Sequence, residues 1–119
     1  MSKVEMKPST MVYPVPAALV SCRDNDNNDN IITIAWIGTV CSKPPMLSIS
    51  VTPNRYSFNM LMDTKEFVVN LTNRDILYET HYCGVKSGRD VNKFEELNLT
   101  KLESRKINAP LIKECPVNI

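Results

Sequence analysis

His81 and Cys83 have the residue types of a nucleophile and its base, but their spacing does not suit that chemistry. Residues two apart on a helix do not face each other, so we expect no Cys-His catalytic pair here. Cys22, Cys41 and Cys115 are far from one another and from Cys83, whereas zinc sites and redox pairs bring two cysteines close in sequence. The sequence therefore predicts four free thiols, packed mostly as small hydrophobic groups.

A run of acidic and amide side chains fills residues 24–30, with carboxylates alternating at Asp24 and Asp26. Such alternation could suggest a calcium loop. The run lacks the central glycine and the distal glutamate of an EF-hand, and it joins two expected strands rather than two helices. We therefore predict a solvated hairpin turn.

The segment from Thr52 to Ser57 leads into an expected helix start. Free backbone N–H groups and the helix dipole make such a start a ready site for an anion. Arg55 could hold a phosphate with two parallel hydrogen bonds, and Ser57 could donate from the cap of the helix. From spacing alone, Arg55 could equally be an exposed surface arginine.

These residues are positioned by a chain in which strands outnumber helices. Strands are expected at 15–23, 31–37, 46–52, 66–71, 99–104 and 115–119. In the third of these, Leu47, Ile49 and Val51 should share one face. Three short helices are expected: one capped by Ser57, one over 76–83 capped by Asp75 and ended by Gly84, and one capped by Asp90 and stopped at Asn98. Gly38 should end the second strand. The pattern predicts a mainly β protein with short helices (α+β), an antiparallel β-barrel or sandwich and not a doubly wound sheet.

Length and charge exclude several classes of protein. The chain has 119 residues, 43% of them hydrophobic, and a net charge of +1, which suits one domain over 1–119 and argues against disorder. The balance of charge also argues against nucleic-acid binding; for an oligonucleotide-binding barrel, the neighbouring Arg55 and Tyr56 are the one basic and aromatic pair worth testing. Neither a membrane-spanning run nor a secretory signal is visible, so no membrane partner and a cytoplasmic location are expected.

Three segments, in order, resemble the flavin reductase-like family, most closely its flavoredoxin branch. The first is NIITIAWIGTVCSKPPM at 30–46. The second is SISVTPNRYS at 48–57 with EFVVN at 66–70. The third is YCGVKSGRDVNKF at 82–94 with APL at 109–111 and ECPVN at 114–118.

The resemblance implies a split β-barrel that binds FMN without a covalent bond and forms a homodimer with the flavin near the subunit interface. It also implies an FMN-dependent oxidoreductase or electron-transfer flavoprotein, served by NAD(P)H or by a redox protein. Hydride transfer is the chemistry of the cofactor, so no catalytic acid, base or nucleophile is assigned.

The resemblance also implies roles for particular residues. Arg55 and Ser57, with Thr52 at the start of their segment, are assigned to the phosphate. Trp36 would lie near the flavin ring, although a lone tryptophan can equally fill a core. Lys93 matches a flavoredoxin position associated with the flavin, where a cation would raise the reduction potential. The remaining candidates are Asn30, for the ring or the ribityl chain; Thr33, Ile34 and Ala35, through backbone groups; and Ser50, the weakest, together with Ser48.

Family members run on by several strands beyond residue 119, so the barrel is expected to be incomplete at its C-terminal end. An unclosed sheet exposes edges that pair readily with another chain. Three readings stay open: a fragment, a barrel closed by exchange with a partner, or a natural short form with weakened FMN binding. The alternative function is accordingly a non-catalytic flavin-binding or assembly module.

Overall fold

A four-stranded antiparallel sheet organises the computed structural model, which describes residues 1–119. The strands are β1 (Ala18–Arg23), β2 (Asp29–Ile34), β5 (Val68–Leu71) and β8 (Val117–Asn118), in the order β2-β1-β5-β8. The expected turn at 24–30 joins β1 to β2: Asp24 accepts hydrogen bonds from the backbone N–H groups of Asp26 and Asn28. Because β2 stands at the end of the order, one of its edges carries no partner strand.

Both faces of the sheet are buried, because the long apolar runs of β1 and β2 send alternate side chains to opposite sides. One cluster holds Leu19 and Ile31 together with Ile76, Cys83, Phe94 and other apolar residues from the C-terminal half. The second cluster comprises Ala18, Val20, Ile32, Ile34 and Val69, and residues of the β3–β4 hairpin pack against it. A sheet covered on both faces gives β2 a rigid position.

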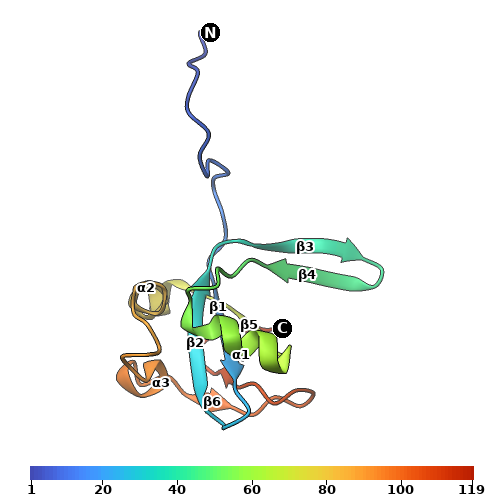
Figure 1. The fold of residues 1–119 in the computed structure, drawn as a ribbon, viewed down its shortest axis with the longest axis vertical. Helices are drawn as coiled ribbons and strands as arrows, with labels where there is room; N and C mark the ends of the chain where they lie inside the picture. Colours follow the sequence, from blue (N-terminus) through green and yellow to red (C-terminus); the bar gives the residue numbers. More distant parts are fainter.

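The expected strand over 31–37 is wrong in its extent. It divides at Ala35 and Trp36 into β2 and β3 (Ile37–Ser42), and β3 pairs with β4 (Pro45–Ile49) in a separate hairpin that projects from the body (Figure 1). Gly38 therefore lies inside β3 instead of ending a strand. The predicted alternation holds, because Leu47, Ile49 and Val51 are half-buried while their neighbours Ser48, Ser50 and Thr52 are exposed.

Three helices form where expected, but their caps differ from the prediction. Helix α1 (Tyr56–Thr64) begins one residue before Ser57, and Arg55 occupies the N-cap position with no side-chain cap hydrogen bond. Helix α2 (Leu77–Val85) follows the short 3₁₀ helix η1 (Arg74–Ile76), whose cap is Asn73, not Asp75, and it runs through Gly84.

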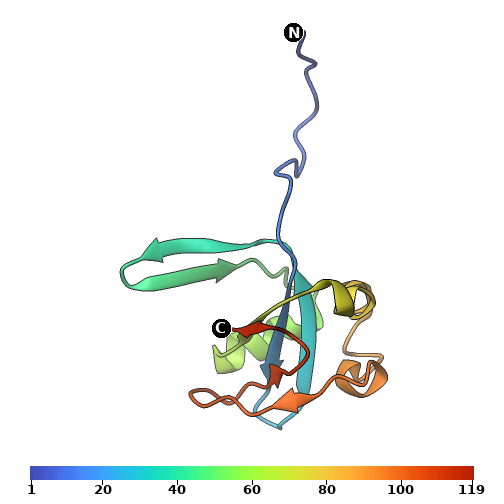
Figure 2. The same ribbon diagram turned by 180° about the vertical axis from the view of Figure 1, so that it is seen from behind.

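The third helix, α3 (Lys93–Glu96), is shorter than expected and is capped by Asn92 in place of Asp90. Asn98 has a φ of 52°, which confirms the left-handed stop. Helices α2 and α3 lie beside β2, and α1 packs on β1 and β2 (Figures 1 and 2).

The C-terminal part of the chain adds three two-residue strands: β6 (Lys101–Leu102), β7 (Leu111–Ile112) and β8. The sequence predicted longer strands at 99–104 and 115–119 and missed β7. Asn70, fully buried on β5, fastens this part to the sheet. Its side-chain oxygen accepts from the Ile112 backbone N–H at 3.1 Å and from the Asn118 amide at 2.7 Å. The fold class predicted from the sequence, mainly β with short helices, is confirmed.

Residues 1–17 contain no helix or strand, so β1 begins at Ala18 and not at Val15 as predicted. No helix of the structure is both long enough and apolar enough to span a bilayer.

Candidate functional site

Two clefts open beside β2 and meet at shared residues. The first, of about 120 Å³, lies between the start of α1 and the α2–α3 connection. The second, of about 230 Å³, follows β2 to Trp36 and the segment 50–52. Ile32 and Arg55 line both clefts. Ten of the candidate residues from the sequence line these two adjoining clefts: Asn30, Ser57 and Lys93 the first, Arg55 both, and Thr33, Ile34, Ala35, Trp36, Ser50 and Thr52 the second. The weak candidate Ser48 is exposed on β4 and lines neither cleft.

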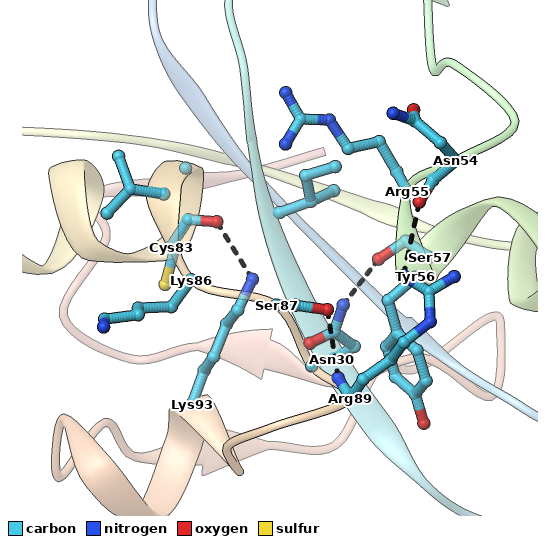
Figure 3. Close-up of a pocket in the computed structure, with 14 residues that line it drawn as sticks. Asn30, Asn54, Arg55, Tyr56, Ser57, Cys83, Lys86, Ser87, Arg89 and Lys93 are labelled. Carbon is cyan, nitrogen blue, oxygen red and sulfur yellow. Dashed lines mark hydrogen bonds between the residues drawn. The ribbon is translucent and has the colours of Figure 1, made fainter.

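The first cleft, here called the cationic cleft, has the chemistry of an anion site. Its walls carry four basic side chains, Arg55, Lys86, Arg89 and Lys93, and no carboxylate. Figure 3 shows how they come from two parts of the chain, Arg55 from the start of α1 and the others from the α2–α3 region. A phosphate here would meet positive charge from both sides together with the positive end of the α1 dipole.

Lys93 is buried rather than on a solvated helix face, with 3% of its surface exposed. Its ammonium group donates to the backbone carbonyls of Ile31 at 2.6 Å and Cys83 at 2.9 Å. Burial lowers the pKa of Lys93, and the nearby Arg55 adds to that effect. No carboxylate offsets the ammonium among the residues that line the cleft, so an anionic ligand would be its natural counter-charge.

Ser57 and Asn30 form a buried pair at the base of the cationic cleft. The Asn30 amide donates to the Ser57 hydroxyl oxygen at 2.7 Å. Ser57 was expected to donate from the helix cap, but it lies inside the first turn of α1. Both side chains line the cleft, so Asn30 orients the Ser57 hydroxyl beside the place that an anion would occupy.

The second cleft, here called the apolar cleft, presents a flat side chain and a free strand edge. Trp36 is 54% exposed, which excludes it from the core and leaves its indole on the cleft wall. The Ile31 carbonyl accepts from Lys93 at the outer edge of β2, so by strand alternation the backbone groups of Thr33 also point outward. The Thr33 hydroxyl is already bonded to the Thr80 carbonyl, which leaves its backbone as the available contact.

The sequence argument missed the residues at 86–89. Lys86, Ser87, Gly88 and Arg89 line the cationic cleft, and Arg89 donates to the Asn54 carbonyl at 3.3 Å. The paired Ser87–Gly88 between two basic residues, next to the helix that holds Lys93, was the available signal. It becomes informative only once the fold brings this connection against α1.

The cysteines and the histidine take no part in the two clefts as nucleophiles. His81 is exposed on α2 while Cys83 is buried, so the two side chains do not meet, as predicted. Burial raises the pKa of the Cys83 thiol, which is near the cationic cleft, to about 11. The four cysteines are free, and three are buried as small core groups.

Comparison with known proteins places this geometry in a family. The flavin reductase like domain matches residues 10–119, so the chain belongs to the flavin reductase-like family, which binds FMN, and its fold is the split barrel of that family. An uncharacterised protein of Archaeoglobus fulgidus is 33% identical over 108 residues, which are 91% of this chain and 60% of that protein.

Two solved structures have a similar fold. Flavoredoxin of Desulfovibrio vulgaris (Miyazaki F) superposes with a TM-score of 0.89 at 30% identity, over 95% of this chain and 62% of that one. An FMN-binding domain of a flavin reductases-like enzyme from Shewanella baltica superposes with a TM-score of 0.79 at 25% identity, over 84% and 52%. The chain thus spans about three fifths or less of the length of these relatives.

Proposed function

We propose that this chain binds FMN in the joined clefts and acts as a flavoredoxin-like oxidoreductase or electron carrier. The observation that carries the proposal is that a cationic cleft and an apolar cleft meet at Ile32 and Arg55. FMN has the matching sequence of groups: a doubly charged phosphate, a polar ribityl chain and a flat ring. Bound FMN would accept a hydride or electrons and pass them on, chemistry that belongs to the cofactor.

In this proposal the cationic cleft holds the phosphate. Arg55 supplies the paired donors, and Lys86 and the Ser57 hydroxyl supply further contacts. Asn30 keeps Ser57 in place and is itself close enough to the ribityl path to bond it. Arg55 lines both clefts, which puts it at the step between phosphate and ribityl chain.

The apolar cleft would hold the ring. Trp36 offers its indole as one wall, and the outward backbone groups of Thr33 and its neighbours offer hydrogen bonds to the ring edge. Ser50 and Thr52 lie across the cleft as polar partners. Lys93, fixed by two carbonyls, holds a positive charge beside β2 that favours the reduced, anionic cofactor and raises its potential.

The activity is tested by adding NADH or NADPH, without oxygen, to protein that retains FMN. Loss of the yellow absorbance of FMN on addition of either nucleotide supports an enzyme that takes electrons from a nicotinamide. Retained absorbance, followed by bleaching with a reduced redox protein, supports the electron carrier. If FMN binds but neither donor reduces it, the non-catalytic flavin-binding module is the better conclusion.

We also propose that the chain forms a homodimer. A cleft lined mainly by apolar residues lies between the segment 9–16 and residues 35–37, and it adjoins the apolar cleft at Ala35 and Trp36. Tyr13 is 70% exposed, and the shared Trp36 is largely exposed as well, so a second copy would bury them both. Sedimentation equilibrium measures the mass directly: twice the chain mass of 13.5 kDa is expected, and a single chain mass at all concentrations would contradict it.

A further inference from the structure

A wall of three residues closes the far end of the cationic cleft. Tyr56, Gly88 and Arg89 line this cleft, and the same three line a third, polar cleft of about 350 Å³ on their other side. The two clefts are therefore neighbours, and the close packing of Gly88 on Tyr56 and Asn30 separates them. The third cleft is rich in amides, from Asn27, Asn28 and Asn92, and also contains Lys101 and the carboxylates of Asp29 and Asp90.

The three wall residues are in close contact with one another and with their neighbours. A Cβ atom on Gly88 would collide with the Tyr56 ring and with the side-chain oxygen of Asn30, so the backbone at 88 lies directly against both residues. Arg89 reaches across the top of the wall: its guanidinium donates to the Asn54 carbonyl at 3.3 Å and lies 5.8 Å from the centre of the Tyr56 ring. Arg89 thus fastens the α2–α3 connection to the start of α1.

The connection is shaped to present Arg89 in this way. The Ser87 hydroxyl accepts from the Arg89 backbone N–H at 3.2 Å, and the Ser87 carbonyl accepts from the backbone N–H groups of Asp90 and Val91. In this tight turn Arg89 supplies the side chain that extends from the connection to α1, because Gly88 has no side chain and Tyr56 belongs to α1 itself.

We propose that Arg89 sets the length of flavin nucleotide that the site accepts, so that a flavin ending in one phosphate binds and a flavin dinucleotide is refused. The inference rests on the proposed function. A terminal phosphate fits a cleft that ends in a wall. A pyrophosphate would have to continue past Arg89 to place its adenosine half in the amide-rich cleft beyond. Selectivity is a difference between two affinities, and a closed wall lowers only the affinity for the longer ligand.

The test is to titrate flavin-free protein with FMN, FAD and riboflavin and to measure the three dissociation constants. The native chain should bind FMN at least about tenfold more tightly than FAD. In Arg89→Ala the affinity for FAD should rise while that for FMN falls, because the wall opens and one positive charge is lost. Damage to the fold would lower both affinities, so a gain for FAD is specific to the wall.

Two further variants separate the parts played by shape and by charge. Arg89→Lys keeps the charge but loses the planar group that reaches Asn54 and Tyr56, so it should hold FMN well and still admit FAD. Arg105→Ala makes the same change of charge on an exposed residue outside both clefts and should leave the FMN to FAD ratio unchanged.

The results that overturn the inference differ from those that overturn the proposed function. Three results would contradict the proposed role of Arg89 while leaving FMN binding intact. They are equal binding of FMN and FAD by the native chain, an unchanged ratio of FMN to FAD affinity in Arg89→Ala, and full native selectivity in Arg89→Lys. A native chain that binds no flavin would refute the proposed function, and the inference with it.

Discussion

At the scale of single residues, the candidate site depends on a few side chains with little freedom to move. Lys93 is fixed by two backbone carbonyls, Ser57 by Asn30, and Arg89 by Asn54 and Tyr56. None of these contacts is local in sequence: the nearest pair, Lys93 and Cys83, is 10 residues apart, and Arg89 and Asn54 are 35 apart. A ligand that enters such a site does not have to order its partners first, which favours tight binding.

Gly88 tests how closely the α2–α3 connection meets α1. Gly88→Ala places a methyl group against Tyr56 and Asn30, and we expect it to lower the free energy of unfolding by about 1–3 kcal/mol and to weaken FMN binding. Gly38→Ala is the matched control, because a Cβ there meets nothing within 4 Å. Urea denaturation of both variants measures the difference, and equal stability would show that the connection does not press on α1.

Lys93 tests whether the buried ammonium has a structural role as well as a place in the flavin site. Lys93→Met fills the same space but leaves the carbonyls of Ile31 and Cys83 without their donor, so we expect a loss of about 1–3 kcal/mol in unfolding free energy. Lys86→Met removes the same charge from an exposed side chain in the same cleft.

Both lysine variants should weaken FMN binding, but only Lys93→Met should be destabilised. It should also lower the reduction potential of bound FMN, because the site loses a positive charge that favours the anionic, reduced flavin. Equal stability of the two variants, measured by denaturation, would contradict the structural part of this account.

At the scale of the elements, the sequence predicts most strands and helices but not where they end. The alternation of Leu47, Ile49 and Val51 is local information and is confirmed. The break at Ala35 and Trp36 was missed because both residues suit a strand; it depends on the hairpin turning away from the sheet. The caps of η1 and α3 differ from the prediction because an amide and an acidic residue lie two apart there, as at Asn73 and Asp75, and either can accept from the first backbone N–H groups.

The residues of the candidate site divide into those that the sequence argument named and those that it missed. The candidates that came with the family resemblance line the two clefts, except Ser48, which lines neither. Arg89 and Gly88 were missed because their contacts join segments about 30 residues apart, and no pattern within either segment predicts them. The burial of Lys93 was also unpredictable, since a lysine on a helix is usually exposed.

Asp29 on β2 forms ion pairs with residues of two other strands, and from them we expect a specific dependence of stability on pH. Its carboxylate, 3% exposed, accepts from Arg23 on β1 and from Lys101 on β6, each at 2.7 Å. Burial by itself would raise the pKa of Asp29, but the hydrogen bonds from the two basic residues outweigh it and lower the pKa. Asp29→Asn should therefore cost about 2 kcal/mol of unfolding free energy at neutral pH.

The sign of the effect on acidification follows from the lowered pKa. The unfolded chain takes up the proton first, so the stabilisation from Asp29 is complete above about pH 4 and is lost as the pH falls through the lower, folded-state pKa. The difference in unfolding free energy between the native chain and Asp29→Asn should decrease as the pH falls over that range. The exposed Asp63→Asn is the control. A difference that stays constant down to the acid transition would contradict the ion pairs.

At the scale of the whole molecule, the packed sheet holds the outer edge of β2, which has no partner strand, in a fixed position. Both faces of the sheet are packed, the C-terminal strands are fastened through Asn70, and the outer edge of β2 stays available between the two clefts. The relatives to which the chain is similar continue for about two fifths more of their length. Residues of this chain line both clefts, so the proposed flavin binding can be tested on it directly.

The central claim is that one ligand binds with its charged end among the basic residues and its ring beside Trp36. Because the chain has one tryptophan, its fluorescence reports on that single position. Titration with FMN should quench the emission of Trp36, and riboflavin, which lacks the phosphate, should need a concentration at least about tenfold higher for the same effect. Arg55→Ala should abolish the advantage of FMN. Saturation with FMN that leaves the tryptophan emission unchanged, or equal affinities for FMN and riboflavin in the native chain, would contradict the account.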